Sequence, residues 1–184
     1  MTTKHETLNL GSMEIVSGAV RVSDPCYDTD TWCSGEIKNV KNGNWDCKVI
    51  RFDEEDWGIR CGYLIVSHRT AYSLSLDDLR WEEQEITVGV DSGQAGIFDK
   101  KYFRDDNNVE NVKRHVPDNA ICTDEPWYSI CCDRTLRKES AGTIPNGCVS
   151  SSGFGDGSYT CSIIKDVKEE EVVGIMIDFG LDES

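Results

Sequence analysis

The sequence has no apolar run long enough to cross a bilayer. Its longest apolar stretches, such as Val172–Ile177, span only a few residues, whereas a membrane-spanning helix needs about 20. The first residues, MTTKHETLNL, contain no basic segment followed by an apolar run. No secretory signal is therefore evident, and we expect a cytoplasmic protein that does not contact a membrane.

Basic residues are also scarce. The 184 residues include 19 lysines and arginines against 34 aspartates and glutamates, which gives a formal net charge of −15. Phosphate backbones and anionic lipids attract lysine and arginine, so direct binding to nucleic acid is not expected. The length predicts a single domain, residues 1–184, that is large enough to bury a core.

Cysteine is abundant, but the spacing typical of metal ligands is missing. The chain has nine cysteines and no C-x-x-C pair, whereas structural zinc sites usually combine two short-spaced pairs. In a reducing compartment these residues remain free thiols, and most are expected to act as small core residues. No cofactor is predicted.

Alternation of apolar and polar residues is more frequent than helical spacing, which indicates mostly strands. Asn42-Gly43-Asn44 predicts a hairpin between residues 37–41 and 45–50, because Asn-Gly favours tight turns. Residues 166–170 are expected to join the last two strands in a second hairpin. The expected strands are Ser12–Val22, Cys47–Phe52, Trp57–Ser67, Glu85–Val90, Ser158–Lys165 and Glu171–Phe179.

Helical spacing is clear in one segment only. Pro126 suits a first helical turn, Thr123 or Asp124 can cap it, and the spacing continues to about Lys138; a shorter helical turn is expected at residues 74–83. The predicted fold class is mainly β (α+β), an antiparallel β-sandwich-like single domain with one or two short helices. Residues 1–11 are expected to form a flexible N-terminus, and the polar residues 105–115 a mobile insertion.

Three aspartates at predicted turns or strand ends are weak candidates for a metal site. They are Asp24 in SDPCYDTD, Asp91 in VGVDSG and Asp156 in SSGFGDGSY, and carboxylates of this kind suit calcium or magnesium. The distal glutamate of a calcium-binding EF-hand loop and the lysine of a phosphate-binding loop are missing. Turns stabilised by aspartate and serine oxygens are therefore favoured, and a metal-dependent enzyme or small-ligand-binding domain is the alternative.

The negative charge gathers in short clusters, two of which adjoin a tryptophan. Carboxylates held at fixed spacing resemble a phosphate backbone and are attracted to a basic groove, and tryptophan is a frequent interface anchor. The candidate partner-binding residues are Asp53, Glu54, Glu55, Asp56, Trp57, Trp81, Glu82, Glu83 and Glu85. A shared face would support mimicry of DNA, whereas a scattered distribution would support solubility alone.

These observations favour a non-enzymatic acidic binding protein. The concrete hypothesis is a phage or mobile-element inhibitor, of the anti-CRISPR or DNA-mimic kind, that acts in the host cytoplasm. It would block the nucleic-acid groove of a host nuclease, because such channels are lined with lysine and arginine. No nucleophile or acid–base pair is indicated by spacing, and association of the chain with its own copies is a further hypothesis.

Four segments together resemble an uncharacterised protein family. The four segments are VDSGQAGIFD, WYSICCDRTL, SSGFGDGSYTC and GIMIDFG. They are similar to a domain of unknown function found in small bacterial and phage proteins, and the opening SGAVRVSDPCY fits the same family. The resemblance covers roughly Ile15 to Phe179. It implies a compact, mostly β domain and no catalytic residues.

Overall fold

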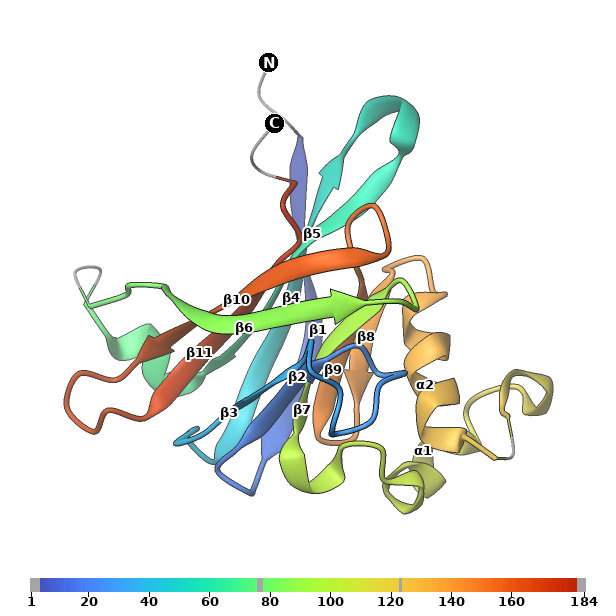
Figure 1. Cartoon of the computed structure of the whole chain (residues 1–184), viewed down its shortest axis with the longest axis horizontal. Coiled ribbons are helices and arrows are strands. Elements are labelled where there is room, and N and C mark those ends of the chain that lie inside the picture. Colours follow the sequence, from blue (N-terminus) through green and yellow to red (C-terminus); the bar gives the residue numbers. More distant parts are fainter. Residues whose placement is uncertain (1–3, 76–77, 123, 182–184) are drawn as a thin grey trace.

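Two antiparallel sheets form the centre of the molecule, as the alternating sequence pattern predicts (Figure 1). A computed structural model describes residues 4–75, 78–122 and 124–181. The six-stranded sheet has the order β1 (His5–Ile15), β4 (Gly43–Asp53), β5 (Ile59–His68), β11 (Val172–Asp178), β10 (Gly157–Lys165) and β6 (Glu82–Val90). The five-stranded sheet has the order β3 (Gly35–Ile37), β2 (Val20–Ser23), β7 (Gln94–Asp99), β9 (Gly147–Ser151) and β8 (Ala141–Ile144).

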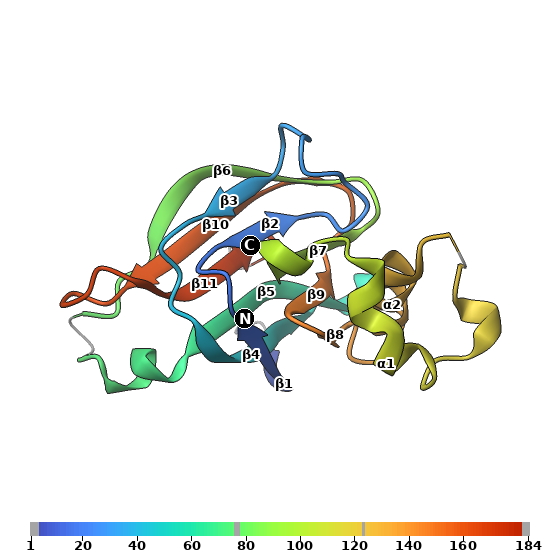
Figure 2. The ribbon, with the colours of Figure 1, turned by 90° about the horizontal axis from the view of Figure 1, so that it is seen from below.

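The main core lies between the two sheets, and the larger sheet curves around the smaller one (Figure 2). In β4 the side chains of Trp45, Cys47 and Val49 are buried while the residues between them are partly exposed. This period of two is the expected pattern for a strand with one face in a core. The predicted sandwich-like, mainly β class is therefore confirmed.

A second core lies on the outer face of the five-stranded sheet, where α2 (Pro126–Thr135) packs on β8 and β9. The rings of Phe98 and Trp127 meet edge to face with centroids 5.0 Å apart, and Phe103 lies 5.3 Å from Trp127. All of β7 is buried because it has a core on each side. None of the helices in the described residues is long and apolar enough to cross a membrane.

The expected strand Ser12–Val22 is two strands that belong to different sheets. The chain leaves β1 at Ile15 and enters β2 at Val20, turning at Gly18, whose φ is +70°. The buried carboxylate of Asp99 fixes this crossing: Oδ2 accepts from the N–H of Val16 at 2.6 Å, and Oδ1 accepts from the hydroxyl of Ser17 at 2.6 Å. The alternating pattern continues through the turn, so periodicity alone misses the break.

The predicted hairpin at Asn42-Gly43-Asn44 is wrong, whereas the hairpin of β10 and β11 is confirmed. β3 pairs with β2 in one sheet and β4 pairs with β1 and β5 in the other. The Asn-Gly segment is a crossing between sheets, in which Asn42 Oδ1 accepts from the N–H of Gly18 at 2.8 Å. Gly43 and Asn44 already belong to β4, and the strands that pair with β3 and β4 are not each other.

Two segments expected to be flexible have regular structure. From His5 onward the N-terminus is β1, paired along its length with β4. Residues 105–115 contain the single-turn helices η4 (Asp106–Val109) and α1 (Glu110–Lys113). Asp106 accepts from the N–H of Trp127 at 3.0 Å, so this segment supplies a side-chain acceptor to the first turn of α2.

The ends of the predicted helices differ from expectation. Helix α2 has Glu125 at its N-cap without a side-chain cap bond, and it ends at Thr135; Thr123, one of the expected caps, lies outside the described residues. The expected turn at 74–83 falls partly on the undescribed residues 76–77, and a single-turn helix, η2 (Arg69–Ser73), precedes it. The remaining single turns are η1 (Glu55–Trp57), η3 (Lys100–Tyr102) and η5 (Asp118–Ala120).

Replacing Asp99 with alanine is expected to destabilise the fold. Asp99→Ala leaves the N–H groups of Val16, Ser17 and Lys101 without their acceptor, and should lower the free energy of unfolding by about 3 kcal/mol. Urea denaturation measures this change. The control Asp28→Ala removes an exposed carboxylate that also accepts two local bonds, and should cost less than about 1 kcal/mol. Equal losses in the two variants would contradict the role of Asp99.

Candidate functional site

Asp24 is buried at the end of β2 and holds the turn that joins β6 to β7. Its Oδ2 accepts from the N–H groups of Asp91 and Ser92, both at 2.8 Å. Its Oδ1 accepts from the hydroxyl of Ser92 at 2.7 Å and from the N–H of Cys26 at 2.8 Å. Four donors therefore occupy this carboxylate, which compensates for its removal from water.

The other two candidate metal ligands lie at the same turn. Asp91 Oδ2 accepts from the hydroxyl of Tyr27 at 2.6 Å, and Asp156 Oδ1 accepts from the N–H of Gly93 at 3.0 Å. The structure thus brings the three aspartates to one turn, where they act as hydrogen-bond acceptors. Within the described residues, no group of three or more His, Cys, Asp or Glu side chains is arranged to hold a metal ion.

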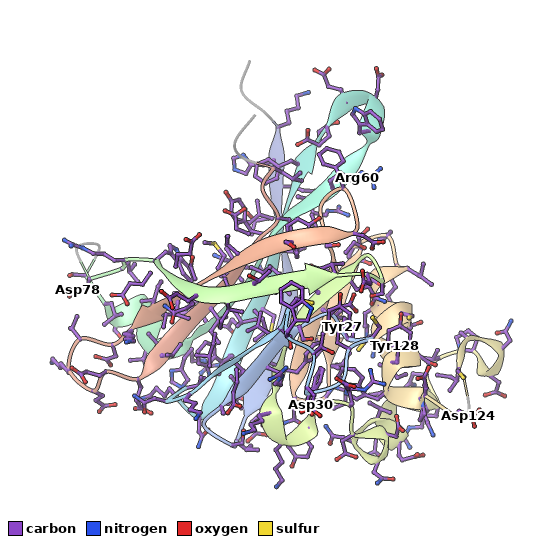
Figure 3. The ribbon with its side chains drawn as sticks, viewed as in Figure 1. Tyr27, Asp30, Arg60, Asp78, Asp124 and Tyr128 are labelled. Carbon is purple, nitrogen blue, oxygen red and sulfur yellow. The ribbon has the colours of Figure 1, made fainter. Side chains whose placement is uncertain are left out.

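The thiol and phenol groups around this turn resist ionisation. Partial burial and the neighbouring Asp24 carboxylate raise the pKa of Cys26 to about 12. Burial and the hydrogen bond to Asp91 raise the pKa of Tyr27 well above its ordinary value, and burial with the adjacent Cys132 raises that of Tyr128 to about 12. Tyr27 and Tyr128 are labelled in Figure 3. These groups stay protonated near neutral pH, so they provide no thiolate or phenolate nucleophile.

The first acidic cluster forms the tip of the long β4–β5 hairpin, which projects away from the two-sheet core at the top of Figure 1. Glu54 N–H donates to the carbonyl of Gly58 at 3.0 Å, and Gly58 N–H donates to the carbonyl of Glu55 at 3.0 Å. These bonds close the tip around η1. We call residues 53–60 together with Phe154 the hairpin head.

Aromatic and basic groups from two segments complete the hairpin head. Trp57 and Phe154 are 69% and 57% exposed, and their rings meet edge to face with centroids 6.3 Å apart. The guanidinium of Arg60 lies 5.8 Å from the centre of the Phe154 ring, and its Nε donates to the carbonyl of Trp57 at 2.9 Å. Ile59, 56% exposed, extends the apolar surface.

The second acidic cluster lies at the start of β6. Glu82, Glu83 and Glu85 are exposed, whereas Trp81 is 39% exposed. The Trp81 ring packs over the backbone of Gly174 in β11. Trp81 is thus half-buried, and the three glutamates follow one edge of the six-stranded sheet.

The two acidic clusters are far apart. Val66 of β5 is in register with Ile175, Ile163 and Glu82 across β11, β10 and β6, while Ile59 begins β5 beside the hairpin head. At about 3.3 Å per residue and 4.8 Å per strand, the separation is about 23 Å along β5 and 14 Å across the sheet. Arg60 at the head and Asp78 near the start of β6 mark these two ends in Figure 3. The clusters therefore do not form one patch.

Comparison with known proteins gives a family. The model of DUF4241, described as a protein of unknown function, matches residues 13–177. The chain belongs to this family. No curated protein and no solved structure matches the chain. The expected relationship to a domain of unknown function is confirmed over almost the same residues.

In this DUF4241 chain, the sequence alone predicts the acidic part of the hairpin head and Trp57, but not Phe154. Asp53–Trp57 is contiguous and was recognised as one cluster. Phe154 comes from the loop between β9 and β10, about a hundred residues later in the chain. Its one available signal was a large aromatic side chain flanked by Gly153 and Gly155, which is unusual for a turn that only reverses the chain.

The influence of Asp24 on the Cys26 thiol is testable by alkylation. Asp24→Asn removes the negative charge that helps to keep Cys26 protonated, so the thiol pKa should fall below about 12 and alkylation by iodoacetamide at pH 9 should become faster. Mass spectrometry of the labelled peptide against pH measures this shift. Asp30→Asn is the matched control, and buried Cys161 must stay unlabelled as evidence that the fold is intact. An unchanged pH profile for Cys26 would contradict the assignment.

Proposed function

We propose that this protein is a non-enzymatic binding protein whose hairpin head docks onto a basic surface of another protein. The observation that supports this function best is the exposed pair of Trp57 and Phe154 next to four carboxylates. Large exposed aromatic side chains beside charged residues are typical of interface centres with a polar rim.

The geometry of the aromatic pair suits a preorganised contact. Arg60 contacts the Phe154 ring, and that ring packs edge to face on Trp57, which restrains both aromatic side chains before a partner arrives. A side chain that is already ordered loses less conformational entropy on binding. Burial of one tryptophan at the centre of an interface is commonly worth about 2 kcal/mol or more.

The charge of the hairpin head defines the chemistry of its partner. The hairpin head carries one guanidinium, that of Arg60, and four carboxylates, those of Asp53, Glu54, Glu55 and Asp56. Such a surface attracts lysine and arginine side chains and accelerates association at low salt. Copies of the head repel one another, which disfavours self-association through this surface.

The partner class that we propose is a nuclease with a lysine- and arginine-lined nucleic-acid channel, an RNA-guided nuclease being the concrete case. On this proposal the chain is a phage or mobile-element inhibitor of the anti-CRISPR kind that acts in the cytoplasm of a bacterial host. The separation of the two acidic clusters counts against imitation of a DNA duplex, so the contact that we propose is a local one, made by the hairpin head alone. A metal-dependent enzyme is not favoured, because backbone and side-chain donors already occupy Asp24.

The test is binding to a panel of purified RNA-guided nucleases by biolayer interferometry. The double variant Trp57→Ala, Phe154→Ala should bind at least about tenfold more weakly than the wild type, because it removes the apolar centre of the contact. Trp32→Ala is the matched control: Trp32 is 84% exposed and lies outside the hairpin head. It should leave affinity unchanged.

A variant that changes only the charge of the hairpin head distinguishes electrostatic attraction of the partner from packing of the aromatic side chains. Glu54→Gln with Asp56→Asn should lower the association rate and weaken its dependence on salt, while dissociation changes less. The proposal would be rejected if no nuclease in the panel bound, or if the head variants bound as the wild type does. Thermal unfolding of each variant establishes that the fold is retained.

A further inference from the structure

Each sheet has an end strand at the same corner of the molecule, and these two strands do not pair with each other as a ladder. β6 ends the six-stranded sheet and β3 ends the five-stranded sheet. They approach where Gly89 N–H donates to the carbonyl of Cys33 at 2.8 Å and where Ile86 packs against Gly35. Before Ile86, no strand among the described residues pairs with the outer side of β6. The open edge is therefore Glu82–Ile86.

A hollow with an apolar floor lies beside the open edge. Its volume is about 400 Å³, and the apolar part of its lining comes from Ile37, Ile86, Ile163 and Val172. A second hollow of about 500 Å³ reaches Glu82 and has Lys165 and Glu170 in common with the first. The two hollows are therefore neighbours at this end of β6.

The pairing of β6 with β10 is irregular at the same place. Thr87 is opposite Thr160 and Glu83 is opposite Ser162, so three residues of β6 lie across from a single residue of β10. Irregularities of this kind bend a strand and increase its twist. Within the open edge, Glu82 and Glu83 pair with β10, whereas residues 84–86 have no partner in its register, and Gln84 and Ile86 line the hollow.

The charge on the open edge selects the strand that can pair with it. Glu82, Glu83 and Glu85 take part in none of the ion pairs found among the described residues. The same edge of a second copy would place like charges opposite one another, which is unfavourable. A strand with basic side chains on that face would instead be attracted.

We infer that the open edge of β6 is a binding site for an extended basic segment of a partner protein, which adds to the sheet as a further strand. In such pairing, main-chain hydrogen bonds supply affinity and alternate side chains supply specificity. The outer side chains Glu83 and Glu85 face the basic residues, while the inner ones, Gln84 and Ile86, adjoin the hollow that takes the apolar residues. This site is separate from the hairpin head and does not depend on the function proposed for it.

The experiment uses a defined probe, the peptide acetyl-Lys-Val-Lys-Val-Lys-Val-amide carrying a fluorophore, with binding followed by fluorescence anisotropy. The full-length chain should bind it saturably. Methylation of alternate peptide nitrogens removes the main-chain donors and should weaken binding at least about tenfold, because a strand cannot be added without those hydrogen bonds. Glu83→Lys with Glu85→Lys should weaken it to a similar extent.

The control variant is Asp118→Lys with Asp124→Lys, which reverses the same number of charges at two exposed residues outside both the open edge and the hairpin head. It should leave peptide affinity within about twofold of the wild type. Failure of the peptide to bind, equal binding of the N-methylated peptide, or greater sensitivity to the control variant than to the β6 variant would each overturn the inference. All four substituted glutamates and aspartates lie outside the core clusters, and thermal unfolding verifies that the variants remain folded.

Discussion

Two buried aspartates fix the chain where it passes from one sheet to the other. Asp99 holds the crossing from β1 to β2, and Asp24 holds the crossing from β6 to β7. They lie at opposite ends of the β2–β7 pairing, in which Val20 is opposite Asp99 and Ser23, next to Asp24, is opposite Gly96. Neither carboxylate is accessible to solvent, and burial of an unpaired carboxylate would cost several kcal/mol. The crossings must therefore place their donors correctly for the sandwich to form.

The exposed features follow from this frame. With both crossings fixed, β6 is held at the end of its sheet, and β4 and β5 pair as a hairpin that continues past the core. The carboxylates and aromatic rings of the hairpin head are thus presented on strands and closed turns, which hold side chains more precisely than free loops do. The acidic residues are thus divided between two distinct surfaces. One is the hairpin head, which also carries aromatic side chains, and the other is the open edge of β6.

Local sequence patterns predict the elements that their own residues mark. They fail where contacts with distant segments decide which strands form and pair. β10, β11 and α2 are predictable because their own residues mark them: the two strands are rich in β-branched residues, and Pro126 lies in the first turn of the helix. β7 is missing from the expected strands, since Gln94–Asp99 is buried on both faces and shows no alternation. The Asn42 hairpin was wrong because a good turn sequence does not specify which strands pair. The contiguous cluster at Trp57 was foreseeable, whereas its contact with Phe154 and its distance from the β6 cluster depend on strand order.

The central claim is that buried carboxylates clamp the two crossings into a rigid frame, and native-state hydrogen exchange of four amides tests it most directly. The amides are those of Val16 and Ser17, which donate to Asp99, and of Asp91 and Ser92, which donate to Asp24. The account predicts that all four exchange only through global unfolding, with an opening free energy equal to that from urea denaturation. Exchange as fast as that of exposed loop amides would contradict it.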